Sequence, residues 1–144
     1  GKEETHCGTG CQSEFGKCEI KQCKTENKYG KIEKEAQTNA LYIWNFLVEK
    51  IGNVYGAAGM IGNMYAESRL NSMNLEKVYE DKLKMTDEQY TKAVDSGKYR
   101  NFTTDSAGYG LVQWTSKKRK EGLLDYAIKQ KKSIGDLQMQ LDYF

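Results

Sequence analysis

The sequence predicts a mainly α-helical protein with a small, disulfide-stapled N-terminal segment. Apolar residues recur at helical spacing in several stretches, two stretches begin with the spacing of a helix capping box, and the 144 residues include no proline. A domain of this length buries roughly 68–70% of its unfolded surface, enough for one core. We therefore divide the chain into an N-terminal appendage, residues 1–33, and a main helical domain, residues 34–144.

All four cysteines lie in the appendage, at Cys7, Cys11, Cys18 and Cys23. An even number of cysteines in a short segment with few large apolar residues is typical of a disulfide-stapled module in an oxidising compartment. A zinc site is the alternative, but the spacings lack the paired form of zinc motifs, so we favour disulfides. Four cysteines allow three pairings, and the spacing does not choose among them.

The main domain begins with two predicted helices. Residues 36–51 place apolar side chains on one face, and Gly52-Asn53 is a stop of the kind found just past helix ends. Residues 54–66 form a second helix with three glycines along one face: Gly56, Gly59 and Gly62. Because glycine costs about 1 kcal/mol relative to alanine in a helix, we expect this face to be buried against another backbone. Residues 68–85 are polar and predicted to be irregular.

Capping motifs predict the helices that follow. Thr86-Asp87-Glu88-Gln89 opens one helix, and Ser133-Ile134-Gly135-Asp136 opens the last one with the same spacing. Between them, residues 98–110 are expected to form a loop or short strand. Thr115 or Ser116 can then cap a helix whose apolar face consists of Leu123, Leu124, Ala127 and Ile128.

The side chains of the main domain exclude several kinds of catalytic site. The only histidine of the chain is His6, in the appendage, so residues 34–144 hold no Ser-His-Asp triad. They also hold no cysteine, which excludes a Cys-His amidase and a zinc hydrolase with imidazole or thiolate ligands. Carboxylates, hydroxyls, amides and aromatic rings remain, and this set suits glycoside cleavage. We expect no cofactor and no metal.

Glu67 is the candidate catalytic acid. It follows ten uncharged residues, 57–66, in a chain of which 29% of the residues are charged. A carboxylic acid held protonated in an apolar pocket can donate its proton to a glycosidic oxygen. The alternative is that Glu67 is a solvated side chain at a helix end.

A second informative segment covers residues 105–115. Its Gly108-Tyr109-Gly110 sequence allows a ligand to approach the backbone closely. Gln113 offers amide donors and acceptors, and the rings of Tyr109 and Trp114 can stack on sugars. The alternative is a tight turn followed by a core tryptophan.

Together these stretches resemble the phage-tail lysozyme family, within the lysozyme-like superfamily. The motifs that carry the resemblance are Tyr42-Ile43-Trp44-Asn45-Phe46-Leu47, Ala57-Ala58-Gly59-Met60-Ile61-Gly62-Asn63 leading to Glu67-Ser68, Asp105 to Thr115, and Gln140-Leu141-Asp142-Tyr143. The resemblance implies a lysozyme-like helical fold. It also implies a bacteriolytic muramidase that cleaves the β-1,4 bond between N-acetylmuramic acid and N-acetylglucosamine in peptidoglycan.

The resemblance also implies roles for individual residues. Glu67 is the implied catalytic acid, and the implied substrate-binding residues are Ser68, Gly108, Tyr109, Gly110, Gln113, Trp114 and Thr115. Asp105 is our candidate for a second carboxylate, because it begins the cleft motif and could position a water. Glu76, Glu80 and Asp95 are weaker candidates. A lytic transglycosylase, which forms an anhydro product, needs the same glutamate and no second carboxylate, so both mechanisms stay open.

The appendage carries a second resemblance. Residues 7–18 resemble the end of a hevein-type chitin-binding module. This resemblance implies a Cys11–Cys18 disulfide and, with it, a Cys7–Cys23 disulfide. Together with the many tyrosines, it leaves a non-catalytic sugar-binding protein as a hypothesis from another functional class.

Charge and hydropathy limit the partners. The net charge of +2 gives no strong nucleic-acid footprint, and no apolar run approaches the roughly 20 residues that span a bilayer. We expect a secreted, extracellular monomer that acts on bacterial peptidoglycan strands, with neither nucleic-acid binding nor membrane insertion. The basic run at residues 117–120 is either a solvated face or a site of attraction to anionic wall polymers.

Overall fold

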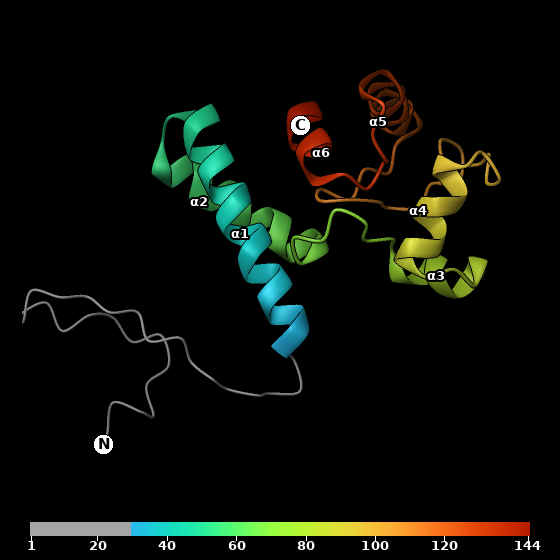
Figure 1. The fold of residues 1–144 in the computed structure, drawn as a ribbon, viewed down its shortest axis with the longest axis horizontal. Helices are drawn as coiled ribbons and strands as arrows, with labels where there is room; N and C mark the ends of the chain where they lie inside the picture. The colour runs from blue at the N-terminus through green and yellow to red at the C-terminus, as the bar shows by residue number, and fades with distance from the viewer. Residues whose placement is uncertain (1–29) are drawn as a thin grey trace, which may run out of the picture. The chain divides into compact units, whose positions relative to one another are not determined.

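The computed structural model describes residues 30–144, with side chains from residue 38 onward. This part of the chain contains six helices: α1 (Gly30–Ile51), α2 (Val54–Ser68), α3 (Lys77–Leu83), α4 (Asp87–Asp95), α5 (Lys117–Gln130) and α6 (Leu137–Tyr143) (Figure 1). Residues 35–144 belong to one compact unit. In place of strands, the described residues have two isolated antiparallel bridges, Leu75 with Tyr109 and Tyr109 with Trp114. The mainly α-helical prediction is confirmed for this part of the chain.

The first hydrophobic cluster joins α1, α2 and α6. Its buried members come from the predicted apolar face of α1, from α2, from α6 and from two loop positions: Ile43, Leu47, Ala57, Met64, Leu70, Leu111 and Leu141. Leu111 therefore brings the segment of residues 105–115 into contact with the helix that carries Glu67.

The second cluster lies around α4 and α5. Its buried helical side chains are Tyr90 and Val94 of α4, Leu123 and Ala127 of α5, and Met139 of α6. The other buried members come from loops: Leu75, Phe102, Ala107, Tyr109, Trp114 and Ile134. Figure 1 shows α1 and α2 at one end of the described domain and α3 and α4 at the other. Val112 and Phe144 pack against both clusters, so the segment that contains Val112 connects them.

Two of the three predicted caps are confirmed. Thr86 caps α4 in a reciprocal capping box with Gln89, and Ser116 caps α5 by accepting from the backbone of Arg119. The third cap is wrong. Asp136, not Ser133, caps α6, because its carboxylate accepts from the backbone N–H of Met139 and the helix starts three residues later than predicted.

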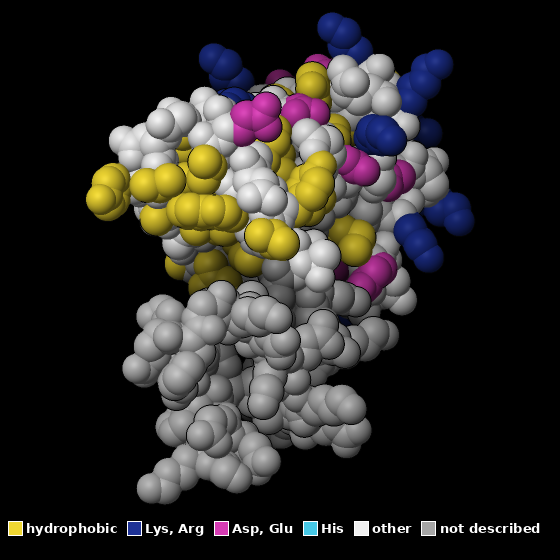
Figure 2. All heavy atoms as spheres, turned by 60° about the vertical axis from the view of Figure 1, so that its left-hand side comes forward, with side chains coloured by type: hydrophobic (Ala, Val, Ile, Leu, Met, Phe, Trp, Pro, Cys, Tyr) yellow, Lys and Arg dark blue, Asp and Glu magenta, His cyan; other side chains and the backbone are white. Residues whose placement is uncertain are grey.

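The prediction that the glycine face of α2 is buried is wrong. The buried residues of α2 are Ala57, Met64 and Ser68, which lie on a different face. A Cβ atom added at Gly59 or Gly62 would meet open space. Exposed large hydrophobic residues also lie on α1 and α2: Leu41, Tyr42, Ile51, Val54, Tyr55 and Tyr65. Figure 2 shows hydrophobic side chains gathered on the side of the molecule that carries these helices.

Helix α3 lies in a stretch that we predicted to be irregular. It buries no side chain, and Val78 is 65% exposed. The residue at its N-cap, Glu76, makes no capping bond with its side chain. The segment therefore has neither the apolar periodicity nor the cap by which a sequence signals a helix.

The cysteines, their predicted disulfides Cys7–Cys23 and Cys11–Cys18, and the hevein-like stretch lie outside the described residues. Among the helices that the structure does describe, none combines the length and the apolar character that crossing a bilayer requires.

Candidate functional site

Glu67 lies in the last turn of α2, and its side chain is exposed. Asn53 caps the start of the helix, because its side chain accepts from the backbone N–H groups of Tyr55, at 2.9 Å, and Gly56, at 3.3 Å. Glu67 forms no hydrogen bond or ion pair with the described part of the chain. The described residues therefore form no apolar pocket around this carboxyl group, contrary to our expectation, and leave it accessible to a ligand.

The backbone after Glu67 takes an unusual path. Arg69 has φ 54° and Leu70 has φ 62°, so two consecutive non-glycine residues adopt the left-handed conformation. Such residues cost about 1–2 kcal/mol each. The backbone N–H of Arg69 bonds to the carbonyl oxygen of Tyr65 at 2.9 Å, and the guanidinium of Arg69 lies 4.8 Å from the centre of the Tyr65 ring. Tertiary contacts must supply the rest of the free energy that holds this turn.

Ser68 supplies one of those contacts. Its buried hydroxyl lies 2.8 Å from the carbonyl oxygen of Leu111 and 3.0 Å from that of Met64. The side-chain amide of Asn74 donates to the carbonyl oxygen of Ser68 at 3.0 Å. Because the hydroxyl is buried against carbonyl groups, the structure argues against the expected sugar contact. Ser68 instead connects the end of α2 to the segment of residues 105–115.

Gln140, a residue to which we had given no role, holds the same segment from α6. Its side-chain carbonyl accepts from the backbone N–H of Leu111 at 3.0 Å. Its amide nitrogen donates to the carbonyl oxygens of Ser72, at 2.6 Å, and Ile134, at 2.7 Å. Gln140 is fully buried. A Cβ atom at Gly110, which has φ 83°, would lie 2.8 Å from the Gln140 oxygen, so this clamp requires glycine.

Tyr109 and Trp114 are core residues, which is the alternative interpretation of this motif. Tyr109 is fully buried, and its hydroxyl lies 2.6 Å from the hydroxyl of Thr91. Its ring packs edge-on against Phe102 at 5.7 Å. Trp114 is 4% exposed and packs 5.5 Å from the ring of Tyr143. Neither ring has an open face in this structure, which argues against the expected stacking on sugar.

Gln113 and Thr115 lie nearer the surface. The Gln113 amide nitrogen donates to the carbonyl oxygens of Asn74, at 2.9 Å, and Gly110, at 3.0 Å. A Cβ atom at the buried Gly108 would lie 2.8 Å from the Gln113 side-chain oxygen, so Gly108 makes room for this side chain. Thr115 is exposed and donates to the carbonyl oxygen of Gln113 at 2.8 Å. Of the predicted sugar contacts, these two have side chains that a ligand can reach.

Asp105, our candidate second carboxylate, is held by four hydrogen bonds. One oxygen accepts from the hydroxyls of Tyr90, at 2.6 Å, and Tyr99, at 2.8 Å. The other accepts from the Lys120 ammonium, at 2.6 Å, and the backbone N–H of Ala107, at 2.9 Å. The side chain is 6% exposed. A carboxylate accepts about four hydrogen bonds, so Asp105 has no capacity left for a catalytic water.

Lys120 is the cation of this buried cluster. Its side chain is fully buried, donates to the carbonyl oxygen of Ala107 at 2.8 Å and lies 4.4 Å from the centre of the Phe102 ring. Burial lowers the pKa of Lys120, while the carboxylates of Asp105 and Glu76 act in the opposite direction. Burial and the Asp105 hydrogen bond also raise the pKa of Tyr90 far above its ordinary value. Residues 117–119 are exposed, whereas Lys120 is buried, so neither interpretation of the basic run, a solvated face or a site for anionic polymers, holds at Lys120.

Glu76 lies beside the segment of residues 105–115. The Leu75–Tyr109 bridge is flanked by two backbone hydrogen bonds, from Gly110 to Asn74 at 2.9 Å and from Glu76 to Gly108 at 2.8 Å. The carboxylate of Glu76 also accepts from the backbone N–H of Gly108 at 3.0 Å. Glu76 is half-buried, and its second oxygen has no hydrogen bond within the described chain.

The other two acidic candidates are engaged elsewhere. A hydrogen bond with Asp87, helped by burial and by the charge of Asp87, raises the pKa of Glu80 to about 7. Asp95 accepts from the Ser133 hydroxyl and from the backbone N–H of Ile134. Glu80 and Asp95 thus tie helices to neighbouring segments.

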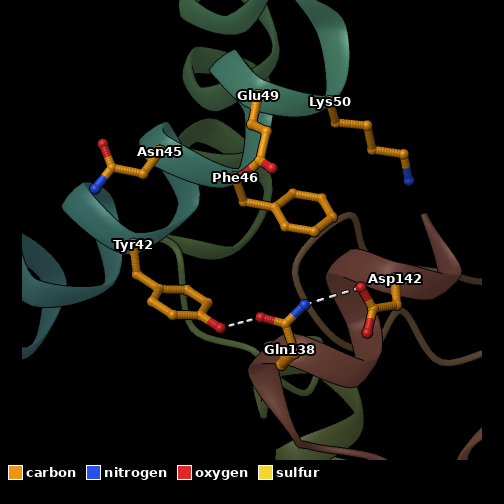
Figure 3. A pocket seen from close by; sticks show the side chains of 7 residues that line it. All are labelled: Tyr42, Asn45, Phe46, Glu49, Lys50, Gln138 and Asp142. Atoms are coloured by element: carbon orange, nitrogen blue, oxygen red, sulfur yellow. Dashed lines mark hydrogen bonds between the residues drawn. The ribbon is translucent and has the colours of Figure 1, made fainter.

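A separate pocket of about 740 Å³ lies between α1 and α6 (Figure 3). Its lining includes none of the predicted site residues and consists of Tyr42, Asn45, Phe46, Glu49, Lys50, Gln138 and Asp142. The Tyr42 hydroxyl donates to Gln138, which donates to Asp142 at 2.8 Å. No group of three or more His, Cys, Asp or Glu side chains that could hold a metal ion occurs within the described chain.

Comparison with known proteins identifies one family. The family described as phage tail lysozyme matches residues 38–144, which is the greater part of the chain. No curated protein and no solved structure matches the chain. The matched range begins in α1 and covers Glu67, the segment of residues 105–115 and α6.

Proposed function

The chain belongs to the phage tail lysozyme family, a peptidoglycan-cleaving class, and from this premise we propose that it is a muramidase with Glu67 as the catalytic acid. The bond cleaved is the β-1,4 linkage between N-acetylmuramic acid and N-acetylglucosamine. The observation that carries the proposal is the position of Glu67. It is an exposed carboxyl group without a partner in the described chain, on a helix end that Ser68, Asn74 and Leu111 hold in place.

The acid role requires a dry environment that the free protein does not provide at Glu67. A glycan strand that lies across the end of α2 would cover the carboxyl group and exclude water from it. In that environment the protonated acid donates to the bridging oxygen as the bond to the muramic acid carbon breaks. Substrate binding therefore completes the site in this proposal.

The segment of residues 105–115 has two parts in the proposal. Gln113 and Thr115 are the proposed sugar contacts, because their side chains are accessible. The buried residues of the motif hold the backbone of this segment in place and do not touch the sugar: Gly108, Tyr109, Gly110 and Trp114. Ser68 is a positioning residue for Glu67, because its hydroxyl bonds to Leu111.

We also propose that the protein acts outside the cell, where its four cysteines can pair. The motivating feature is the cysteine cluster of residues 7–23. Mass spectrometry after alkylation without reduction tests this: no alkylated cysteine supports two disulfides, and four alkylated cysteines in the active protein contradict them.

Analysis of digested peptidoglycan tests the proposed activity. Purified peptidoglycan is incubated with the protein, and the released muropeptides are examined by mass spectrometry with and without borohydride reduction. Muropeptides with a reducing N-acetylmuramic acid end are the expected product. Anhydro-muropeptides would instead identify a lytic transglycosylase, and saturable binding without release would identify a sugar-binding protein.

A further inference from the structure

We propose that Glu76 is the second catalytic carboxylate and activates the water that completes hydrolysis. This inference rests on the proposed function, because it assigns the partner of Glu67 in the same reaction. Glu76 thereby takes the place of Asp105 as the candidate second carboxylate.

The register places Glu76 on the side of the chain that faces α2. Leu75 and Tyr109 pair across an antiparallel bridge and are both buried in the second cluster. Successive side chains in an extended segment point to opposite sides. Asn74 and Glu76 therefore point away from that cluster, on the same side as each other.

Asn74 shows what lies on that side. Its amide donates to the carbonyl oxygen of Ser68 at 3.0 Å, so this side of the segment meets the end of α2. Glu67 immediately precedes Ser68. Two residues of extended chain advance roughly 6–7 Å, so Glu76 projects from the segment about that far beyond Asn74. The register thus puts the Glu76 side chain on the side of the backbone pairing that meets the end of α2, the helix that carries Glu67.

The bonding of Glu76 suits a base better than the bonding of Asp105 does. One Glu76 oxygen is fixed by the backbone N–H of Gly108 at 3.0 Å, which orients the group. The other oxygen is free in the described chain, whereas both oxygens of Asp105 each accept two hydrogen bonds. Glu76 is half-buried, so a water can reach it.

The Glu76 carboxylate forms no ion pair with the described part of the chain. The Gln113 side chain lies beside Gly108, the residue that holds Glu76. Lys120 is near enough for the Glu76 charge to act on it, but its ammonium bonds to Asp105, Tyr90 and a backbone carbonyl. Asp105 is thus the ion-pair partner of Lys120, and the Lys120 ammonium makes no hydrogen bond to Glu76.

Glu67 gives its proton to the bridging oxygen, and the bond between that oxygen and C1 of N-acetylmuramic acid breaks with both electrons going to the oxygen. A water oxygen bonds to C1 from the opposite face, and the Glu76 carboxylate takes the proton that this water loses. One water is consumed, and solvent returns the proton from Glu76 to Glu67. The product is the α-anomer, because the attack inverts C1.

Glu76→Gln separates a catalytic role from a structural one. Glutamine keeps a side-chain oxygen that can accept from the Gly108 N–H, but it cannot take a proton from water. We expect kcat on a soluble peptidoglycan oligosaccharide to fall about 100-fold or more, with KM and the melting temperature nearly unchanged. Glu88→Gln, at an exposed position on α4, is the matched control and is expected to keep full kcat. A Glu76→Gln variant with the kcat of the unmodified protein would overturn the inference.

Product stereochemistry provides a second readout. Proton NMR during the first turnovers is expected to show the α-anomer of the new reducing end, and the β-anomer would overturn the role of Glu76 as a base. Failure of the inference differs from failure of the proposed function. If Glu67→Gln is inactive and Glu76→Gln is fully active, only the inference fails; if the unmodified protein releases no muropeptide, both fail.

Discussion

The hydroxyl of Ser68 donates to the carbonyl oxygen of Leu111 at 2.8 Å, across 43 residues of sequence. Ser68 follows Glu67 directly, and the backbone N–H of Leu111 is in turn held by Gln140 at 3.0 Å. Two hydrogen bonds therefore link α6 to the residue beside the proposed catalytic acid. The core of the domain therefore holds the end of α2, where Glu67 lies.

Ser68→Ala tests this link. The substitution leaves the buried carbonyl oxygen of Leu111 without its donor, which typically costs about 1–3 kcal/mol. We expect the free energy of unfolding to fall by that amount and kcat to fall while KM changes little, because Glu67 loses its support. Urea denaturation and wall-lysis kinetics measure the two effects. Ser96→Ala, at an exposed position, is the control and should change stability by no more than about 0.5 kcal/mol.

Gln140→Leu tests the clamp from α6. It removes three hydrogen bonds at once and leaves buried partners on Leu111, Ser72 and Ile134. We expect a loss of more than about 2 kcal/mol, because each unsatisfied buried group costs about 1–3 kcal/mol. Gln138→Leu, two residues earlier on an exposed position, should be nearly neutral. Equal stability of the two variants in urea would show that the hydrogen bonds of the Gln140 side-chain amide do not stabilise the fold.

Asp105 and Lys120 should behave as a coupled pair. Removal of one partner of a buried ion pair leaves an uncompensated charge and typically costs 3–5 kcal/mol. We expect losses of about this size for Asp105→Asn and for Lys120→Met. The double variant should lose much less than the sum, because no buried charge remains. Chemical denaturation of the four proteins measures the coupling.

The exposed pair of Lys117 and Glu121, at 3.7 Å, is the matched comparison for that cycle. Surface pairs of this kind contribute roughly 0–1 kcal/mol, so Lys117→Met should change stability little. If the losses in the free energy of unfolding for Asp105→Asn and Lys120→Met add up in the double variant, the proposed coupling of this buried ion pair is contradicted. A loss of kcat in Asp105→Asn at unchanged stability would restore Asp105 as a catalytic candidate.

The carboxyl pair of Glu80 and Asp87 predicts a pH dependence of stability. The pKa of Glu80 is raised from 4.5 to about 7, chiefly by its hydrogen bond with Asp87. The folded state therefore holds a proton that the unfolded chain releases near pH 4.5. Stability should decrease as the pH rises from about 4.5 through about 7, since the unfolded state binds fewer protons in this window.

Glu80→Gln should remove this slope. Urea midpoints at pH 5 and pH 8 are compared for the variant and the unmodified protein. We expect the midpoint of the variant to depend less on pH. A slope that stays the same in Glu80→Gln would assign the proton to another group, and Glu88→Gln should keep the slope because Glu88 is exposed.

Local signals predicted the helices whose ends are set by neighbouring residues. The capping box of Thr86 and Gln89 and the cap at Ser116 involve partners three residues away, so the sequence displays them directly. The small-residue helix was also predicted, from Val54, although its buried face was not. Helix α3 was missed because nothing local marks it: it buries no side chain and its cap residue makes no side-chain bond.

The candidate site was predictable only in part, because its chemistry depends on contacts distant in sequence. The sequence predicted Glu67 and the segment of residues 105–115, but not that Tyr109 and Trp114 are buried. It suggested a solvated face at Lys120, whose partner Asp105 lies 15 residues away. The register that favours Glu76 comes from its pairing with Gly108, 32 residues away, which no local pattern shows.

Glu67→Gln is the most direct test of the central claim. Because Glu67 is exposed and has no partner in the described chain, the substitution should leave the melting temperature and the helical circular dichroism unchanged. Release of reducing muropeptides from purified peptidoglycan, measured by mass spectrometry, should fall to the background of a reaction without enzyme. A Glu67→Gln protein that releases muropeptides at the rate of the unmodified protein would contradict the assignment of Glu67 as the catalytic acid.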